Sequence, residues 1–159
     1  MQHGSTDRSV HPPSVEGAKE PSSGQDGGSG PIQVALDRLV SYNPFVVSPW
    51  QGVDDPIDRA DVARAIAERR LHSEFLPDFP SRPITTQEHV ERIAFFVVEG
   101  WSDPIHIDVG VPALGHAVAW PIVDGNHRLA AAFYLQRESI AAEISGQVDY
   151  AEEILGVKI

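Results

Sequence analysis

Apolar residues recur at helical spacing in two stretches of the chain. In residues 58–72 the apolar stripe consists of Val62, Ala63, Ile66, Ala67 and Leu71. In residues 86–99 it consists of Val90, Ile93, Ala94 and Val97. Each pattern predicts an amphipathic helix. The second helix also has boundary signals, because residues 85–88 (Thr-Thr-Gln-Glu) form a capping-box pattern and Gly100 is a typical helix end.

Three later segments favour β-strands. Residues 104–109 alternate between apolar and polar positions, whereas residues 117–123 form a mostly apolar run that predicts a largely buried strand. Residues 140–144 predict a third strand. Pro121 places the second strand at an edge or a bulge, because proline cannot donate a ladder hydrogen bond. An alanine-rich helix over residues 129–136 and a short helix over residues 150–155 complete this half of the chain.

The first part of the chain has weaker patterns. Residues 31–40 fit a short helix or an irregular strand, and residues 42–50, which prolines interrupt, are interpreted as strand and loop. Residues 1–30 are rich in Ser, Gly, Pro, Gln and Asp and predict a disordered tail. The remaining elements predict one domain over residues 31–159, of α+β or mixed α/β class, with a small mixed sheet flanked by helices.

Composition restricts the possible functions. The chain of 159 residues has a net charge of −11, which argues against a free-standing DNA-binding protein, because DNA affinity comes mainly from Lys and Arg on phosphates. A small anionic ligand needs only a few local donors and stays possible. Cysteine is absent, which excludes disulfides, thiolate metal sites and a cysteine nucleophile. No apolar run is long enough for a membrane span and no signal core begins the chain, so we expect a cytoplasmic protein.

The main candidate site is the polar turn of residues 124–128 (Asp-Gly-Asn-His-Arg), between an apolar strand and the alanine-rich helix. The first amides of a helix lack partners within it and attract anions. Gly125 permits a tight turn, and Arg128 supplies a fork suited to phosphate. Asn126 and His127 add donors or acceptors, and Asp124 is a candidate helix cap, ribose ligand or magnesium ligand. A purely structural interpretation also stands: a cap, a turn, local packing of His127 and a surface ion pair.

Histidines elsewhere show no compact metal-binding spacing, so we interpret His72, His89, His106 and His116 as ordinary residues. His106 and Asp108 share one face of their predicted strand and could approach the turn.

A longer sequence pattern surrounds the turn. A helix ending at Gly100 is followed by a Pro-Ile strand at residues 104–109, then by a strand, a Gly-x-x-Arg turn and an Ala-rich helix at residues 122–132, and by a short strand at residues 140–144. With Arg82 upstream, this order resembles the ParB/sulfiredoxin-like superfamily over residues 81–155. The resemblance implies the fold of that superfamily and a nucleotide such as CTP or ATP, with magnesium, at the turn.

The resemblance also assigns roles. In ParB-type partition proteins a Gly-Glu-Arg-Arg turn holds CTP phosphates, which corresponds here to Gly125, Asn126, His127 and Arg128, and Arg82 loosely matches a Pro-x-Arg element. Asn126 and His127 depart from the partition pattern. Sulfiredoxins have Gly-Cys-His-Arg, so Asn126 occupies the nucleophile position and excludes sulfinic-acid repair. Free serine kinases, which share this fold, imply that it can support phosphoryl transfer. The sequence given ends without a helix-turn-helix, so we do not expect DNA partition from it alone.

A second resemblance is to the His-Pro-Phe-x-Asp-Gly-Asn-Gly-Arg loop of Fic AMP-transferases. Trp120 stands at the catalytic histidine position and Ala131 at a later arginine, and Fic domains are all-helical. The sequence hypothesis is therefore a domain that binds a nucleotide or another small phosphorylated ligand. If it is an enzyme, we expect phosphoryl transfer or nucleotide hydrolysis with Asp124 and His127 as catalytic residues. The alternatives are a non-catalytic regulatory or interaction module, a metal-dependent ParB-like nuclease and a degenerate Fic-like AMP-transferase.

Overall fold

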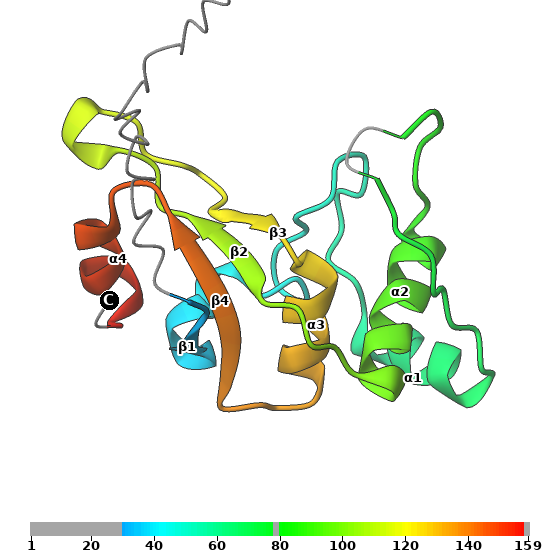
Figure 1. Ribbon diagram of the computed structural model, residues 1–159. Coiled ribbons are helices and arrows are strands. Elements are labelled where there is room, and N and C mark those ends of the chain that lie inside the picture. The colour runs from blue at the N-terminus through cyan, green and yellow to red at the C-terminus, as the bar shows by residue number, and fades with distance from the viewer. Residues whose placement is uncertain (1–29, 78–79, 158–159) are drawn as a thin grey trace, which may run out of the picture.

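A computed structural model describes residues 30–77 and 80–157, and the predicted disordered tail lies outside the described residues except for Gly30. In the described part, four strands form one mixed sheet of order β1-β4-β2-β3 (Figure 1). β4 pairs antiparallel with β1 and parallel with β2, and β3 pairs antiparallel with β2. The strands are β1 (Ile32–Ala35), β2 (Ile105–Asp108), β3 (Ile122–Asp124) and β4 (Ser139–Ser145).

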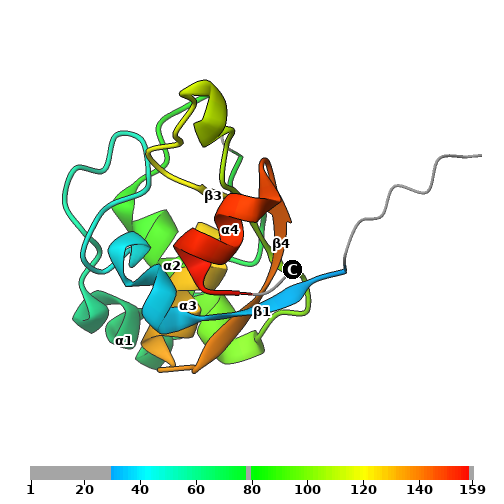
Figure 2. The same cartoon turned by 90° about the vertical axis from the view of Figure 1, so that its left-hand side faces the viewer.

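Helices cover both faces of this sheet. On one face, α3 packs against β2 and β4, α2 packs on α3, and α1 packs on α2 (Figure 1). On the other face, α4 packs on β4 beside the 3₁₀-helix η1, which Figure 2 shows in front of the sheet. The described chain is therefore an α+β fold. Its helices are η1 (Leu36–Tyr42), α1 (Arg59–Ala67), α2 (Thr86–Glu99), η2 (Pro112–Leu114), α3 (Asn126–Tyr134) and α4 (Val148–Leu155).

Helix α3 joins two hydrophobic clusters. Leu129 and Ala132 pack into the cluster of the sheet, whereas Ala130 and Ala131 pack into a second cluster with α1 and α2. All four side chains are fully buried. The alanines therefore allow close packing on two sides of α3, with Ala132 on the sheet side and Ala130 and Ala131 on the side of α1 and α2. This double packing fixes the start of α3 in space.

The boundary signals of α2 are confirmed. The Thr85 hydroxyl accepts a hydrogen bond from the amide of Glu88 (3.2 Å), and the Glu88 carboxylate accepts one from the amide of Thr85 (2.9 Å). The helix ends at Gly100, whose φ is 76°. Helix α1 begins after Asp58, which caps the amide of Ala60 (2.8 Å), and it ends earlier than the predicted residue 72. No helix in the described ranges is long and apolar enough to cross a membrane.

Three sequence expectations need correction. The strand predicted at residues 117–123 is reduced to β3, and residues 117–119 are exposed. Pro121 lies just before this edge strand, as expected for proline at an edge, and the register irregularity with β2 falls between Ile122 and Asp124. Residues 42–50 contain no strand, because Asn43 folds them into turns by accepting from the amide of Phe45 (3.0 Å). Residues 31–40 form both a strand and a 3₁₀-helix.

Candidate functional site

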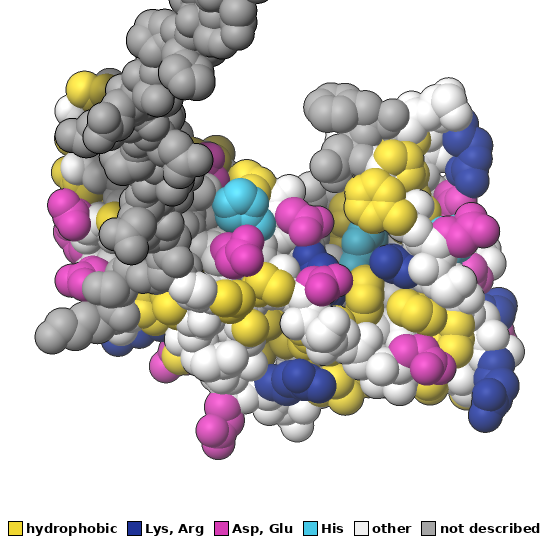
Figure 3. Space-filling model, in the orientation of Figure 1, with side chains coloured by type: hydrophobic (Ala, Val, Ile, Leu, Met, Phe, Trp, Pro, Cys, Tyr) yellow, Lys and Arg dark blue, Asp and Glu magenta, His cyan; other side chains and the backbone are white. Residues whose placement is uncertain are grey.

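A cavity of about 910 Å³ opens beside the start of α3. One wall, here called the turn wall, consists of residues 124–128. The opposite wall, here called the helix wall, consists of His89, Arg92 and Phe96 of α2 with Trp50 and Phe75 of the preceding loops. In Figure 3, acidic, basic and histidine side chains gather with hydrophobic ones where β3 and the start of α3 face α2. The volume and the mixed lining are typical of a small-molecule site.

Gly125 forms the tight turn that the sequence predicted. Its φ of 92° lies in the left-handed region, and a Cβ atom there would lie 2.6 Å from Cγ2 of Ile105. Both facts require glycine at this position. The first hydrogen bond within α3 runs from the amide of Leu129 to the carbonyl of Gly125 (2.8 Å). The three preceding amides of the helix therefore have no acceptor within it.

Asn126 holds the turn in place. Its Oδ1 accepts a hydrogen bond from Nε1 of Trp120 (2.9 Å), and its Nδ2 donates to the carbonyl of Ile122 (3.1 Å). Both ends of the side chain are thus bonded within the protein, although the residue lines the cavity. In this conformation the Asn126 side chain ties the turn wall to Trp120 and to the backbone of β3.

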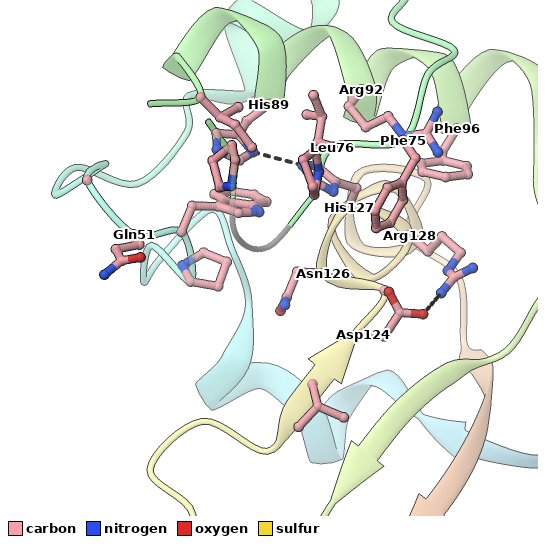
Figure 4. A pocket seen from close by; sticks show the side chains of 18 of the residues that line it. Gln51, Phe75, Leu76, His89, Arg92, Phe96, Asp124, Asn126, His127 and Arg128 are labelled. Atoms are coloured by element: carbon pink, nitrogen blue, oxygen red, sulfur yellow. Dashed lines mark hydrogen bonds and ion pairs between the residues drawn. The ribbon is translucent and has the colours of Figure 1, made fainter. Parts of the chain in front are cut away.

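Arg128 is held between carboxylates at the base of the turn wall. Its Nη2 donates to Oδ2 of Asp124 (2.6 Å), and its Nη1 lies 3.9 Å from Oδ2 of Asp103 (Figure 4). The Arg128 side chain is 12% exposed, whereas Asp124 is 62% exposed. The Nε atom of Arg128 is buried without a hydrogen-bond partner. A buried donor without a partner is unfavourable, and this atom lies against Gly125, 3.1 Å from the position of an added Cβ atom.

A pair of imidazoles joins the two walls. Nδ1 of His89 lies 2.8 Å from Nε2 of His127, as the dashed line in Figure 4 shows. Trp50 stacks on both rings, with centroid distances of 4.6 Å to His89 and 5.1 Å to His127. Burial lowers the pKa of His89 to about 4. Burial also lowers the pKa of His127 well below its ordinary range, and nearby positive charges, including Arg92 and Arg128, lower it further. Both rings are therefore neutral near pH 7, and one donates to the other.

Arg92 adds positive charge to the helix wall. Its Nη1 donates to the carbonyls of His72 (3.2 Å) and Ser73 (2.6 Å), and its guanidinium lies 4.4 Å from the ring centroid of Phe96. No carboxylate of the described residues lies within ion-pair distance of it. Burial lowers the pKa of Arg92, and the charge of Arg128 lowers it further. Arg92 is therefore a cavity-lining cation that no carboxylate of the described residues offsets, whereas Arg128 is paired with Asp124.

The other candidate residues from the sequence are largely exposed or are bonded outside the cavity. Arg82 lines the cavity, but its side chain is 65% exposed and it pairs with Glu88 (2.9 Å). Nε2 of His106 contacts the hydroxyl of Ser145 (3.0 Å), and Asp108 accepts from the amide of Gly110 (2.8 Å), so these two side chains bond elsewhere. Neither lines the cavity.

Sequence reasoning missed the helix wall. His89 was interpreted as an ordinary residue, and no role was assigned to Arg92, Phe96, Trp50 or Phe75. A signal did exist in α2, because His89, Arg92 and Phe96 follow at intervals of three and four and so share a face of the helix. Nothing in the sequence indicated which face of α2 would meet the turn.

A metal centre is not preformed here. Within residues 30–77 and 80–157, no group of three or more His, Cys, Asp or Glu side chains could hold a metal ion. Asp124 is the predicted magnesium ligand, and its carboxylate is engaged by Arg128. The donor set around Asp124 thus does not fit a resident magnesium ion.

Comparison with known proteins gives no match: no family model, no curated protein and no solved structure is significantly similar to this chain. The functional argument therefore rests on the chemistry of the cavity.

Proposed function

We propose that this chain binds a phosphorylated nucleoside in the cavity beside α3. The observation that carries the proposal is Arg92, which lines the cavity without a carboxylate partner among the described residues, in a protein whose net charge is −11. Burial lowers the pKa values of Arg92 and His127, and the charge of Arg128 lowers both further. Such unbalanced charge is unfavourable in a partly buried site, and a bound anion relieves it.

The phosphate is proposed to bind at the turn wall. The unpaired first amides of α3 and the helix dipole favour an anion at this point. The Arg128 guanidinium lines the cavity beside these amides, and Arg92 approaches from the opposite wall. Arginine is suited to this role because its planar fork matches phosphate oxygens.

The base is proposed to bind along the apolar part of the helix wall. Phe75 and Phe96 line the cavity beside the charged side chains, and Phe75 is 70% exposed although it is a large apolar residue. Aromatic rings stack on nucleic-acid bases of any sequence. A phosphate site next to such a surface favours a nucleotide over a simple inorganic anion.

The order of elements supports the resemblance to the ParB/sulfiredoxin-like superfamily. α2 ends at Gly100, β2 follows, β3 leads through Gly125 into α3, and β4 comes next. This is the order on which the resemblance was based. The superfamily assignment and the stand-alone ParB-like domain stay proposals, as fold alone does not fix function.

Catalysis is the second candidate. The neutral His127 lies in the cavity at the proposed phosphate site, which favours phosphoryl transfer or nucleotide hydrolysis over other reactions. In the unliganded structure its Nε2 contacts His89, and Asp124 pairs with Arg128. Both predicted catalytic side chains thus need a ligand-induced change of partner, so binding is the better-supported function.

The test is calorimetric titration of the full chain with AMP, CMP, ADP, ATP and CTP, with and without magnesium. We expect at least one nucleotide to bind, and Arg128→Ala to weaken it about tenfold or more, because hydrogen bonds to charged groups contribute about 1.5–3 kcal/mol. Arg64→Ala is the matched control, since Arg64 is 60% exposed and lies outside the cavity. Equal affinity in the two variants, or no binding to wild type, contradicts the proposal.

The alternative functions predict different results in this titration and in an assay of nucleic-acid cleavage. A non-catalytic interaction module shows no nucleotide response and tolerates Asp124→Ala. A nuclease shows metal-dependent cleavage of nucleic acid that Asp124→Ala abolishes. The Fic-like alternative loses support from the sheet, because an all-helical architecture does not contain β3 before the loop.

A further inference from the structure

The charges that line the cavity are almost balanced before a ligand binds. Three arginines line it: Arg82, Arg92 and Arg128. Arg82 pairs with Glu88, and Arg128 pairs with Asp124. Arg92 is the arginine of this set whose charge meets no carboxylate within ion-pair distance in the described residues. With Asp103, which lies 3.9 Å from Arg128, the three arginines face three carboxylates among the described residues, and this balance suits a ligand of low charge.

Carboxylates also limit where further phosphates could bind. Asp103 and Asp124 both line the cavity beside Arg128, and their side chains are 82% and 62% exposed. A second or third phosphate group extending from Arg128 would approach these negative charges. Like charges at short distance repel, and the repulsion is strongest where one group is partly buried. The two carboxylates thus favour a ligand with one phosphate group and disfavour a diphosphate or triphosphate.

Proteins usually neutralise a triphosphate with magnesium, held by one or two carboxylates together with the phosphates. The carboxylate that this role requires, Asp124, is already bonded to Arg128 at 2.6 Å. Breaking that pair would leave a guanidinium that is 12% exposed without its carboxylate. The arrangement therefore favours a ligand that needs no metal.

The surface beside these charged side chains is aromatic. Phe75, Phe96 and Trp101 line it together with prolines and Leu76, and Figure 4 shows Phe75, Leu76 and Phe96 beside His127 and Arg128. This surface adds no charge but offers stacking area for a planar ring. A ligand that fits both surfaces carries one phosphate and one aromatic base.

From this charge balance we infer that the ligand class is nucleoside monophosphates, bound without a divalent metal ion. The inference rests on the proposed function, since it names the ligand of the same cavity. It replaces the CTP or ATP with magnesium that the superfamily resemblance implies. The phosphate pairs with Arg92 and the unpaired first amides of α3 while the Arg128–Asp124 pair stays intact.

The experiment is calorimetric titration of the full chain with CMP and AMP against CTP and ATP, each with magnesium and with a chelator. We expect the better monophosphate to bind at least about tenfold more tightly than its triphosphate, with no change on chelation. Tighter binding of a triphosphate, or equal binding of both, overturns the inference and leaves the proposed function standing. Absence of all nucleotide binding overturns both.

Two further arms make the test specific. Ribose 5-phosphate and inorganic phosphate carry the phosphate without the base, so either binding as tightly as the monophosphate overturns the nucleoside part of the inference. Asp103→Asn removes a carboxylate beside Arg128, and we expect it to reduce the ratio of monophosphate affinity to triphosphate affinity several-fold. Asp55→Asn, an exposed aspartate outside the cavity, is the matched control and should keep the wild-type ratio. An unchanged ratio in Asp103→Asn contradicts the charge argument.

Discussion

The two walls of the cavity are built in opposite ways. The turn wall is one continuous segment of five residues, positioned by β3, by Gly125 and by the double packing of α3. The helix wall combines side chains from α2 with Trp50 and Phe75, which are far apart in the sequence. Local backbone geometry fixes the first wall, whereas tertiary packing assembles the second.

This difference separates anion binding from ligand selection. The turn wall supplies amides and Arg128, which any phosphate could use. The helix wall supplies the aromatic surface, Arg92 and the second imidazole, and under the proposed function these would select among phosphorylated ligands. The two walls meet at the His89–His127 contact.

The largest expected effect concerns this contact. Because burial lowers the pKa of both histidines, the unfolded chain binds their protons more tightly than the native protein does. For His89 the stability contribution is complete above the unfolded pKa near 6.5 and is lost as the pH falls towards about 4. For His127 the loss begins at the same unfolded pKa and continues as the pH falls. Between pH 7 and pH 5 we expect a loss of about 2 kcal/mol for each histidine, measured by urea unfolding.

A matched pair of variants isolates this effect. The double variant His89→Gln with His127→Gln should have a much smaller pH dependence between pH 5 and pH 7 than wild type. His116→Asn changes an exposed histidine outside the cavity and should keep the wild-type dependence. The carboxylates of Glu88 and Glu91 have lowered pKa values, so their losses occur in a more acidic range. A wild-type protein with constant stability from pH 7 to pH 5 would contradict the neutral imidazole pair.

The second effect compares Gly125 of the turn wall with Gly52, which lines the cavity in the loop that carries Trp50. Gly125→Ala forces a Cβ atom to within 2.6 Å of Ile105 in a left-handed backbone, and we expect a loss of about 3 kcal/mol from strain and overpacking together. Gly52, in the loop that carries Trp50, also has a positive φ of 79°, but no atom lies within 4 Å of its added Cβ. Gly52→Ala should therefore cost about 1 kcal/mol, from backbone strain alone. Similar losses in thermal unfolding would mean that the turn wall is less tightly packed than described.

The third effect concerns polar side chains on the two sides of the cavity. Asn126→Ala removes hydrogen bonds to Trp120 and Ile122, and we expect a loss of about 2 kcal/mol in unfolding free energy. Gln51→Ala changes an exposed polar residue that lines the cavity on the opposite side, and it should stay within about 0.5 kcal/mol of wild type. If Asn126 contacted only ligand, its replacement would lower affinity and leave stability intact.

The smallest effect distinguishes two arginines. Arg82 is 65% exposed and paired with Glu88, so Arg82→Ala should change the unfolding free energy by less than about 1 kcal/mol and nucleotide affinity by about twofold at most. Arg92→Met keeps the apolar stem but removes the unpaired charge, and we expect about a tenfold loss of affinity. A larger effect of Arg82→Ala on affinity would restore Arg82 as the phosphate ligand that the sequence suggested.

Sequence patterns predicted the parts of the molecule that depend on neighbouring residues. The capping box at Thr85, the helix end at Gly100 and the turn at Gly125 are local signals, and the structure confirms each of them. The fold class also followed from the spacing of apolar residues. The strand predicted over residues 117–123 was too long, because a run of apolar residues does not show whether a partner strand lies opposite. In the structure only Ile122–Asp124 pairs with β2.

The helix wall escaped prediction for a physical reason. His89 lies on the buried face of α2, where a histidine is acceptable only with a partner, and that partner is His127 on α3. The pairing depends on how α2 packs on α3, which no short pattern encodes. Likewise, the roles of Asn126 and Arg128 as phosphate ligands stay predictions, since the structure shows their partners within the protein and contains no ligand.

The central position of β4 affects the order in which the protein can fold. β4 is the last described strand along the chain, yet it lies between β1 and β2. The Ser139–Gln33 contact between β4 and β1 closes 106 positions of chain, whereas the His89–His127 contact closes 38. Contacts between distant residues form slowly, because more chain entropy is lost on closing them. During folding, the two walls of the cavity can therefore meet before the outer strand β1 pairs with β4.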